Sequence, residues 1–328
     1  MFKATVIIAT CNRADLLVKA LSSILDQKAK GIRFEVIVVD NNSKDKTRDV
    51  VVAMAESTMV PLNYSFEPMQ GKAFALNRGI KEAQGEIIVF CDDDIIADPH
   101  WLMNLVNCFE TYRCDAVGGR VLPDYPQHTP QWIKTNAKFL VGPIVSYDYG
   151  NEVKIYQNKF MYEFLGANFA FKKSVFSELG MFRSDLGPGR TLMGEDTEMV
   201  SRLIKADKSL YYCGTALIWH PVDRKRMSLR YIAKWNMSLG YCRVIVDEKS
   251  RPEGLKYIFG YPRYLLKTIA GQIGMLIKNM FNRDIFIGIW IELFINIGKA
   301  KQIRRYRLKP QRKEVADEAS REHSHLHV

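Results

Sequence analysis

Several short motifs that would assign a chain to a common class of protein are missing from this sequence. No G-x-G-x-x-G follows the first apolar run, which disfavours a dinucleotide-binding fold, and no G-x-x-x-x-G-K-[ST] occurs, which disfavours a P-loop protein. None of the six cysteines has C-x-x-C spacing, and most of them lie inside apolar runs. We therefore expect free, buried thiols in a reducing compartment.

The sequence also lacks a secretory signal and any long uninterrupted apolar run. The N-terminal stretch MFKATVIIATCNRADLL has a short apolar run that leads directly into a strand–turn–helix pattern, so we expect a cytoplasmic chain without a signal peptide. The apolar segment 264–280 is amphipathic, and a narrow polar stripe interrupts the apolar segment 284–298. Neither segment supplies the ~20 uninterrupted apolar residues that a membrane span needs.

Positive charge is abundant but unevenly placed along the 328 residues. The formal net charge is +11, of which the eight Lys and Arg residues of segment 299–313 supply +8, so that the rest of the chain carries only +3. A basic segment of this kind can meet nucleic acid or anionic lipid, or can remain solvated without a partner.

The first part of the chain alternates strand and helix patterns. Four apolar runs are typical of strands buried on both faces, and segments with helical spacing follow them. The strands are predicted at 4–9, 34–40, 61–67 and 86–91, and the helices from about Leu17 and at 45–57, 71–85 and 98–110, the last with Asp98 as its cap. Such alternation predicts a doubly wound, mostly parallel α/β sheet, whose ligands bind at the carboxyl ends of the strands.

The middle of the chain has a different organisation. It is predicted to contain strands at 115–123 and 210–221, a strand and short helix within 166–180, and a helix at 195–207. A long Gly-rich loop, 182–194, is expected to move over a substrate. The sequence after His220 predicts a helical region, 223–313, followed by a polar, disordered tail, 314–328.

The stretch GEIIVFCDDDIIADPHW places three consecutive acids, Asp92, Asp93 and Asp94, after a buried strand. Carboxylates in this position can bind a divalent cation, take part in acid–base chemistry, or form a solvated acidic turn. Because alternate residues of an extended chain point the same way, Asp92 and Asp94 can face one ligand while Asp93 points elsewhere.

Five segments follow one another between Thr5 and Pro221: VIIATCNRADLLVKALSSIL, FEVIVVDNNSKDKT, GKAFALNRGIKEAQGEIIVFCDDD, GANFAFKKSVFSELGMF and GEDTEMVSRL. Together, and in this order, they resemble glycosyltransferase family 2, the inverting nucleotide-sugar glycosyltransferases with the GT-A fold. The resemblance implies a GT-A catalytic domain at 1–222, with a nucleotide-sugar-binding half, 1–115, and an acceptor-side half, 116–222.

The resemblance also implies roles for particular residues. In the family's pattern the nucleotide sugar, with UDP as the expected nucleotide, would be bound by Thr10, Asn12, Arg13, Asp40, Lys72, Arg78, Asp92 and Asp93. A divalent metal, Mn²⁺ or Mg²⁺, would be held by Asp94 with Asp92, and His220 matches the place of a further ligand; a structural histidine is the alternative. Solvent-facing positions on a helix are the alternative for Lys72 and Arg78.

The GED segment supplies a candidate base for the reaction. Asp196 matches the family's general base, which removes the proton of the acceptor hydroxyl, and Glu195 is its neighbour. Acids in the first turn of a helix are favoured in any case, but this does not account for the Gly-rich loop before them. Attack opposite the leaving group would invert the anomeric configuration.

Other classes of protein remain as alternatives. A nucleotide-sugar nucleotidyltransferase would carry a Gly-rich loop after the first strand, and TCNRAD contains no glycine. A non-enzymatic protein that binds nucleic acid would leave the acids without a task, so we expect no nucleic-acid partner. The acceptor is expected to be a sugar or a lipid-linked sugar. Segment 264–313 is expected to contact an anionic membrane on its cytoplasmic face, or else to pack as a helical hairpin on the catalytic domain.

Overall fold

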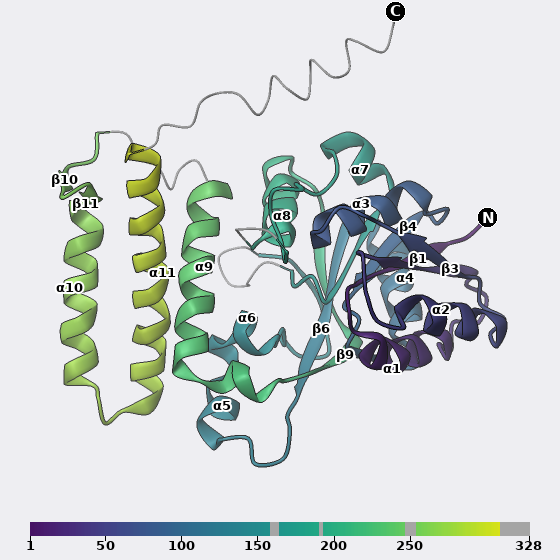
Figure 1. Ribbon diagram of the computed structural model, residues 1–328, viewed down its shortest axis with the longest axis horizontal. Coiled ribbons are helices and arrows are strands. Elements are labelled where there is room, and N and C mark those ends of the chain that lie inside the picture. The colour runs from purple at the N-terminus through teal and green to yellow at the C-terminus, as the bar shows by residue number, and fades with distance from the viewer. Residues whose placement is uncertain (158–163, 190–192, 247–253, 309–328) are drawn as a thin grey trace, which may run out of the picture. The chain divides into compact units, whose positions relative to one another are not determined.

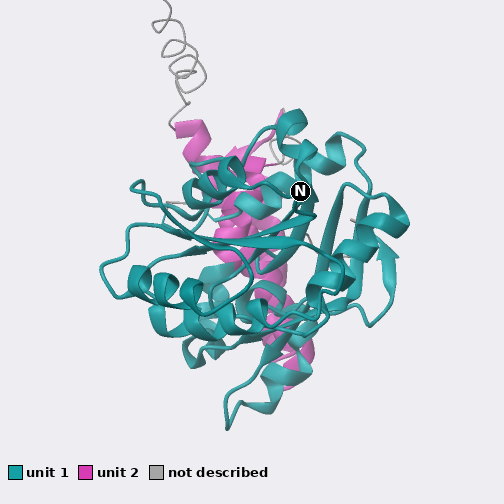
Figure 2. Cartoon of the chain, turned by 90° about the vertical axis from the view of Figure 1, so that its right-hand side faces the viewer, with its two compact units in different colours: residues 1–235 teal, residues 236–328 magenta. Residues whose placement is uncertain are grey.

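The computed structural model describes residues 1–157, 164–189, 193–246 and 254–308. The chain forms two compact units, Met1–Trp235 and Asn236–Val328, which Figures 1 and 2 show. The predicted polar tail, 314–328, and residues 190–192 of the predicted Gly-rich loop lie outside the described residues.

One half of the sheet of the first unit is parallel, as the alternation predicts. Its strands lie in the order β3-β2-β1-β4, and every neighbouring pair is parallel. The continuous β-branched runs of β1 and β2 are buried because helices cover both faces of a doubly wound sheet. The bounds are β1 Ala4–Thr10, β2 Phe34–Asp40, β3 Leu62–Phe66 and β4 Ile87–Cys91.

The other half of the sheet has mixed pairing. From β4 the order continues β8-β6-β9-β5, with β7 also on β9, and only β6 and β9 run parallel here. The pairing of β6 with β9 shifts register between Gly119 and Arg120. The bounds are β5 Ile96–Ala97, β6 Ala116–Asp124, β7 Val153–Ile155, β8 Asn168–Lys172 and β9 Leu210–Pro221.

Helices lie on both faces of the sheet. In Figure 1, α1 and α2 lie below the strands as drawn, and α3, α7 and α8 lie above them. The helices that begin in the first unit are α1 Ala14–Leu25, α2 Thr47–Glu56, α3 Lys72–Glu82, α4 Trp101–Tyr112, α5 Gln131–Thr135, α6 Val141–Ile144, α7 Ser174–Leu179, α8 Glu195–Lys205 and α9 Leu229–Val246, with short 3-10 turns at Ala137–Phe139 and Arg224–Met227. Most of α9 belongs to the second unit.

Helix α4 begins later than the sequence predicts. Asp98 does not cap it: the Asp98 carboxylate accepts a hydrogen bond from the His100 amide (2.9 Å), within a turn that precedes the helix. The helix starts at Trp101, whose indole N–H donates to Asn168 Oδ1 (2.8 Å). This contact, across 67 residues of sequence, joins the first residue of the helix to β8.

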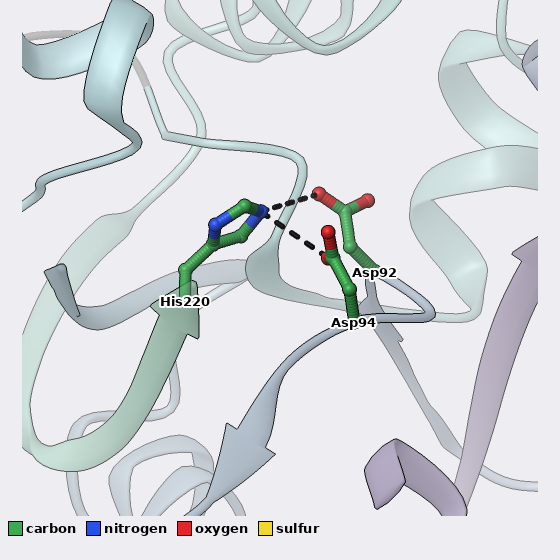
Figure 3. A group of neighbouring side chains, drawn as sticks. All are labelled: Asp92, Asp94 and His220. Atoms are coloured by element: carbon green, nitrogen blue, oxygen red, sulfur yellow. Dashed lines mark ion pairs between the residues drawn. The ribbon is translucent and has the colours of Figure 1, made fainter. Parts of the chain in front are cut away.

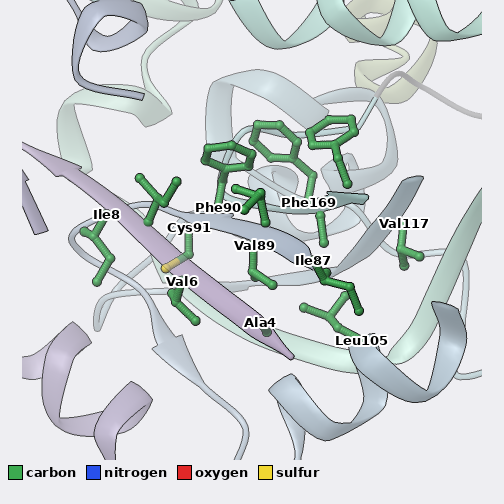
Figure 4. Packing of buried hydrophobic residues seen from close by; sticks show 14 of the residues in the cluster. Ala4, Val6, Ile8, Ile87, Val89, Phe90, Cys91, Leu105, Val117 and Phe169 are labelled. Carbon is green, nitrogen blue, oxygen red and sulfur yellow. The ribbon is translucent and has the colours of Figure 1, made fainter. Parts of the chain in front are cut away.

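The core of the first unit forms around strand β4. Its alternating side chains divide between the two faces of the sheet, so that Ile87, Val89 and Cys91 point away from Phe90 (Figure 4). Phe90 stacks on Phe169 of β8, with ring centroids 5.0 Å apart. These buried contacts hold the strand whose end carries the acids.

The second unit contains a helical hairpin, α10 (Arg263–Lys278) and α11 (Arg283–Leu308), preceded by the two short strands β10 (Tyr257–Ile258) and β11 (Tyr261–Pro262). Helix α11 is longer than the predicted 284–298 and includes the first part of the basic segment. Its large apolar residues Ile287, Ile291, Leu293 and Ile295 are buried.

Two glycines allow α9 and α11 to cross closely within the second unit. A Cβ at Gly240 would lie 2.1 Å from the carbonyl oxygen of Ile295, and one at Gly298 would lie 2.1 Å from that of Met237. Across the described residues, no helix has the length and apolar character needed to cross a membrane.

Candidate active site

The register of the parallel strands brings the predicted polar residues to one edge of the sheet. Thr10 at the end of β1 pairs with Asp40 at the end of β2, and Ile8 pairs with Cys91 at the end of β4. The acidic triplet, which directly follows Cys91, therefore lies at the carboxyl edge of the parallel strands, where doubly wound sheets bind ligands.

The loop after β1 holds two of the three acids. Thr10 Oγ1 donates to Asp93 Oδ2 (2.7 Å), and Arg13 Nη1 donates to Asp93 Oδ1 (2.7 Å). The second guanidinium nitrogen of Arg13 pairs with Asp94 Oδ2. Asp93 is 3 % exposed and is thus a buried anchor for the first loop, with both carboxylate oxygens bonded.

Asp92, Asp94 and His220 converge on one point (Figure 3). His220 Nε2 lies 3.3 Å from Asp94 Oδ1 and 3.9 Å from Asp92 Oδ2. The other ring nitrogen, Nδ1, lies 2.9 Å from the Pro221 carbonyl oxygen, so the tautomer protonated at Nδ1 turns a lone pair at Nε2 toward the two carboxylates.

This group has the donor set of a divalent cation site. The three residues each offer one atom, and these atoms lie within 4.8 Å of one another. Asp94 Oδ1 is buried and has no hydrogen-bond partner among the described residues, which costs free energy unless another positive group approaches it. Two carboxylates and an imidazole backed by a carbonyl fit such an ion.

The carboxylates of the triplet differ in their electrostatic environment. Burial alone would raise the pKa of Asp92, but Lys72 and His220 outweigh burial and lower it. Burial raises the pKa of Asp93 to about 6, although Arg13 and Thr10 act in the opposite direction. Asp92 is therefore the readier of the two to carry negative charge.

Lys72, the first residue of α3, points into the site. Its backbone amide donates to the carbonyl of Pro188 (3.0 Å), and its ammonium forms an ion pair with Asp92. Burial opposes the charged form of Lys72, but Asp92 and Glu195 outweigh burial and raise its pKa. Lys72 is thus a fixed positive charge between the acidic triplet and the start of α8.

Asp196 lies in the first turn of α8, after Gly194, which has a positive φ of 105°. Its carboxylate accepts backbone hydrogen bonds from Gly166 (3.0 Å) and Thr197 (2.7 Å). A Cβ at Gly166 would lie 3.2 Å from Asp196 Oδ2 and 3.5 Å from Lys72 Nζ, which places both charged groups around this glycine.

Glu195 and Asp196 are both harder to ionise than ordinary carboxyl groups. Burial and the charge of Asp196 raise the pKa of Glu195 to about 7, and Lys72 only partly opposes them. Burial also raises the pKa of Asp196, against its two backbone hydrogen bonds. A carboxylate with a raised pKa is the stronger proton acceptor, as a general base requires.

Asp40 belongs to a neighbouring group of polar contacts. Its carboxylate accepts from the Ser43 amide (2.8 Å) and from the Tyr64 hydroxyl (2.8 Å). Asn12 adopts a left-handed φ of 54°. Its side-chain Oδ1 accepts a hydrogen bond from the Lys44 backbone amide (2.6 Å), and its backbone N–H donates to Ser43 Oγ. The loops after β1 and β2 are therefore joined at this edge.

Arg78 is the one predicted site residue whose contacts lie elsewhere. Its guanidinium pairs with Glu82, one helical turn further along α3, and its side chain is 48 % exposed. The six-residue separation from Lys72 turns it by about 240° around the helix, so the two cations do not share a face.

The sequence patterns did not predict three residues that contact the site acids. Tyr64 and Ser43 hold Asp40, and Gly166 contributes only a backbone N–H to Asp196. Gly166 begins one of the five segments that resemble the family, GANFAFKKSVFSELGMF. However, no spacing rule predicts a contact between Gly166 and an acid 30 residues away.

Comparisons with known proteins identify the family of this chain. The model of glycosyl transferase family 2 matches residues 5–180, more than half of the chain. The chain therefore belongs to glycosyl transferase family 2, and its enzyme class is that of a glycosyltransferase.

Individual relatives agree with this assignment over different lengths. An uncharacterized glycosyltransferase of Nostoc sp. is 36% identical over 116 residues, which are 35% of either chain. The glucosyl-dolichyl phosphate glucuronosyltransferase of Haloferax volcanii is 28% identical over 251 residues, 75% of this chain and 77% of that protein. The match thus spans about a third of the first relative and three quarters of the second.

A solved structure supports the fold. The mannosyltransferase of Pyrobaculum calidifontis, determined with GDP-Man and Mn²⁺, superposes with a TM-score of 0.55 at 18% identity, covering 98% of this chain and 79% of that one. The GT-A fold predicted from the sequence is confirmed.

Proposed function

We propose that this chain transfers a sugar from a nucleotide diphosphate sugar to an acceptor hydroxyl, with inversion at the anomeric carbon, in the synthesis of a polysaccharide or glycolipid. One observation carries the proposal: Lys72 joins the acidic triplet to the start of α8. Its ammonium pairs with Asp92, and the charges of Glu195 and Asp196 act on the same ammonium.

Two acids of the triplet, together with His220, would bind the donor through a metal ion. Asp92, Asp94 and His220 would hold Mn²⁺ or Mg²⁺. When bound, such an ion supplies positive charge to the diphosphate of the leaving nucleotide. Lys72 adds a second positive charge on the same side. The loops that carry Asn12 and Asp40 would face the nucleoside, with UDP as the proposed nucleotide.

Asp196 would act on the acceptor. Its two backbone hydrogen bonds fix the carboxylate while its raised pKa favours proton uptake, so it would take the proton of the acceptor hydroxyl as that oxygen attacks. Glu195 lies buried beside it, and the charge of Asp196 adds to burial in raising the pKa of Glu195. With the leaving group on the opposite face, the product has inverted configuration.

The acceptor is proposed to be a sugar or a lipid-linked sugar at the cytoplasmic face of a membrane. One similar protein, from Haloferax volcanii, is named for action on a glucosyl-dolichyl phosphate. A lipid-linked acceptor requires the enzyme to work at the membrane surface, to which the second unit would attach.

The test is the variant Asp196→Asn in a transfer assay. We expect turnover to fall by about 10²–10⁴-fold, because the amide cannot accept the proton. Binding of the nucleotide sugar, measured by calorimetry, should stay within a few-fold of wild type. NMR of the wild-type product reports the anomeric configuration.

A matched control is Asp207→Asn, at the end of α8. Asp207 is exposed and has a left-handed φ of 52°, a conformation that asparagine adopts as readily as aspartate. This variant should transfer at the wild-type rate. Wild-type turnover by Asp196→Asn would reject Asp196 as the base, and a retained configuration would reject the direct displacement.

A further inference from the structure

One continuous segment of the second unit, 254–283, combines positive charge with exposed apolar side chains. It contains no Asp or Glu, and all of its basic residues are exposed: Lys256, Arg263, Lys267, Lys278 and Arg283. It also contains the exposed large hydrophobic residues Ile258, Phe259, Tyr264, Ile273, Met275, Ile277, Met280 and Phe281. No other stretch of similar length among the described residues gathers so many.

The exposed side chains of α10 lie on the faces of the helix that do not pack against the rest of the chain. Its buried residues Leu265, Gln272 and Leu276 lie on one side of the helix. At 100° per residue, Lys267 and Lys278 fall on the opposite side. Tyr264 and Met275 border this basic stripe on one flank, and Ile273 and Ile277 border it on the other.

A strained aromatic residue stands at one end of α10. Phe259 is 90% exposed and has a left-handed φ of 49°, next to Gly260 at 81°, in the two-residue turn between β10 and β11. Such turns favour Asn-Gly, and a bulky residue at this position costs free energy. Because Phe259 is 90% exposed, its ring adds almost no buried surface to the second unit. A contact with a molecule outside the chain would account for a phenylalanine at this position.

A second aromatic residue stands at the other end. Phe281, in the turn between α10 and α11, is 93% exposed, with Met280 and Ile277 beside it at 58% and 68%. Figure 1 shows the β10–β11 turn and the α10–α11 turn at opposite ends of α10. The helix has 16 residues and is about 24 Å long, so the two aromatic tips bracket its basic stripe.

Helix α11 lies in the same segment, 264–313, that the sequence predicts to contact a membrane, but it exposes fewer of its large apolar side chains than α10 does. Its residues Ile287, Ile291, Leu293 and Ile295 are buried, and only Ile285 and Leu308, near its ends, are exposed large apolar residues. Arg304 and Arg307 lie over the rings of Tyr261 and Tyr257. Most of the exposed large apolar side chains of the second unit, among its described residues, therefore belong to α10 and its flanking turns rather than to α11.

We propose that α10 and its two flanking turns form a docking surface for an anionic lipid bilayer, with Lys267 and Lys278 at the phosphates and Phe259 and Phe281 inserted between the head groups. Positive charge without any acid attracts anionic lipid, and exposed aromatic side chains partition into the interface. The proposal rests on the membrane location given in the proposed function, but lipid binding at this surface does not depend on sugar transfer.

The test is co-sedimentation of the full chain with vesicles, either neutral phosphatidylcholine or phosphatidylcholine containing phosphatidylglycerol. We expect wild type to bind the anionic vesicles and to be released by 0.5 M KCl, as screening requires. The pair Lys267→Gln and Lys278→Gln should weaken binding about tenfold or more. Matched controls are the exposed pair Lys28→Gln and Lys30→Gln in the first unit, which should bind as wild type does.

Further variants distinguish a loss of vesicle binding from a loss of folding, and binding by α10 from binding by the basic part of α11. Phe259→Asn should weaken vesicle binding several-fold while it keeps or raises the melting temperature, because asparagine suits the turn. Met59→Ser, at a residue 98% exposed in the first unit, should leave binding unchanged. The pair Lys301→Gln and Arg305→Gln, from the basic part of α11, should have a smaller effect than the α10 pair.

Three results would overturn the proposal. The first is equal binding to neutral and anionic vesicles, and the second is a greater loss from the α11 pair than from the α10 pair. The third is a decrease in oligomer mass for Phe259→Asn without loss of vesicle binding, which would make this face a contact between copies of the chain. Since vesicle binding is measured without substrate, its failure would leave the transfer assay of Asp196→Asn unaffected.

Discussion

Asp92, Asp93 and Asp94 are adjacent in the chain, yet each carboxylate has a different partner. Asp92 pairs with Lys72, Asp93 is bonded by Thr10 and Arg13, and Asp94 shares Arg13 but leaves Oδ1 unpaired next to His220. The mutual repulsion of three acids is offset by two cations on one side. On the other side it creates the place that a divalent cation would fill.

At the same scale, Glu195 gives a prediction for pH dependence. Its pKa is raised to about 7 in the folded chain, above its ordinary 4.5, so the folded state holds this proton more tightly than the unfolded state does. Stability is therefore lost as the pH rises from about 4.5 to about 7, and the full cost is present above that range.

Replacing this group with Glu195→Gln should remove the cost. At pH 8 we expect the variant to unfold in urea with a free energy higher than wild type by on the order of 2 kcal/mol, and at pH 4 we expect no difference. Glu56→Gln, at an exposed residue at the end of α2, is the control and should show no such pH dependence. A difference that is the same at both pH values would contradict the raised pKa.

At the scale of elements, the crossing of α9 and α11 depends on glycine. Because a Cβ at Gly298 would lie 2.1 Å from a backbone oxygen, Gly298→Val must push the helices apart. We expect a loss of about 2–3 kcal/mol in the stability of the second unit. Hydrogen exchange of the α11 amides would measure it, because this method reads local opening directly.

The matched control lies in the same helix. Gly288 has open space around its Cβ position, so Gly288→Ala should slow exchange in α11 by the equivalent of about 0.5–1 kcal/mol. If both variants changed exchange in the same direction, helix propensity and not close packing would dominate this element.

At the scale of the whole molecule, donor binding should be visible as thermal stability. With Mn²⁺ and a UDP- or GDP-sugar at 100 times its Kd, we expect a gain of about 2.7 kcal/mol, seen as a higher melting temperature. Chelator should remove most of the gain, and Asp94→Asn should abolish its metal-dependent part. The control Asp26→Asn, at an exposed residue after α1, should respond as wild type does. A full gain in chelator would reject the cation site.

Local patterns were sufficient for much of this protein. The apolar runs of β1, β2 and β4 predicted buried parallel strands, because covering both faces of a strand demands apolar residues throughout. The acids after β4 and at the start of α8 were predicted as site residues, since strand ends and helix starts bring such groups to the ligand edge. The family motifs predicted the GT-A fold, which the structure and the comparisons bear out.

Only the tertiary structure decided which partners these residues have. Arg13 bonds Asp93 across 80 residues and Asp196 bonds Gly166 across 30, and no periodicity encodes such distances. For the same reason the sequence predicted a membrane contact for the whole of segment 264–313, whereas most of the exposed large apolar side chains that the structure describes there belong to α10 and the turn after it. Hydrophobicity is a property of a segment, but exposure depends on what packs against it, and that is settled only when the chain has folded.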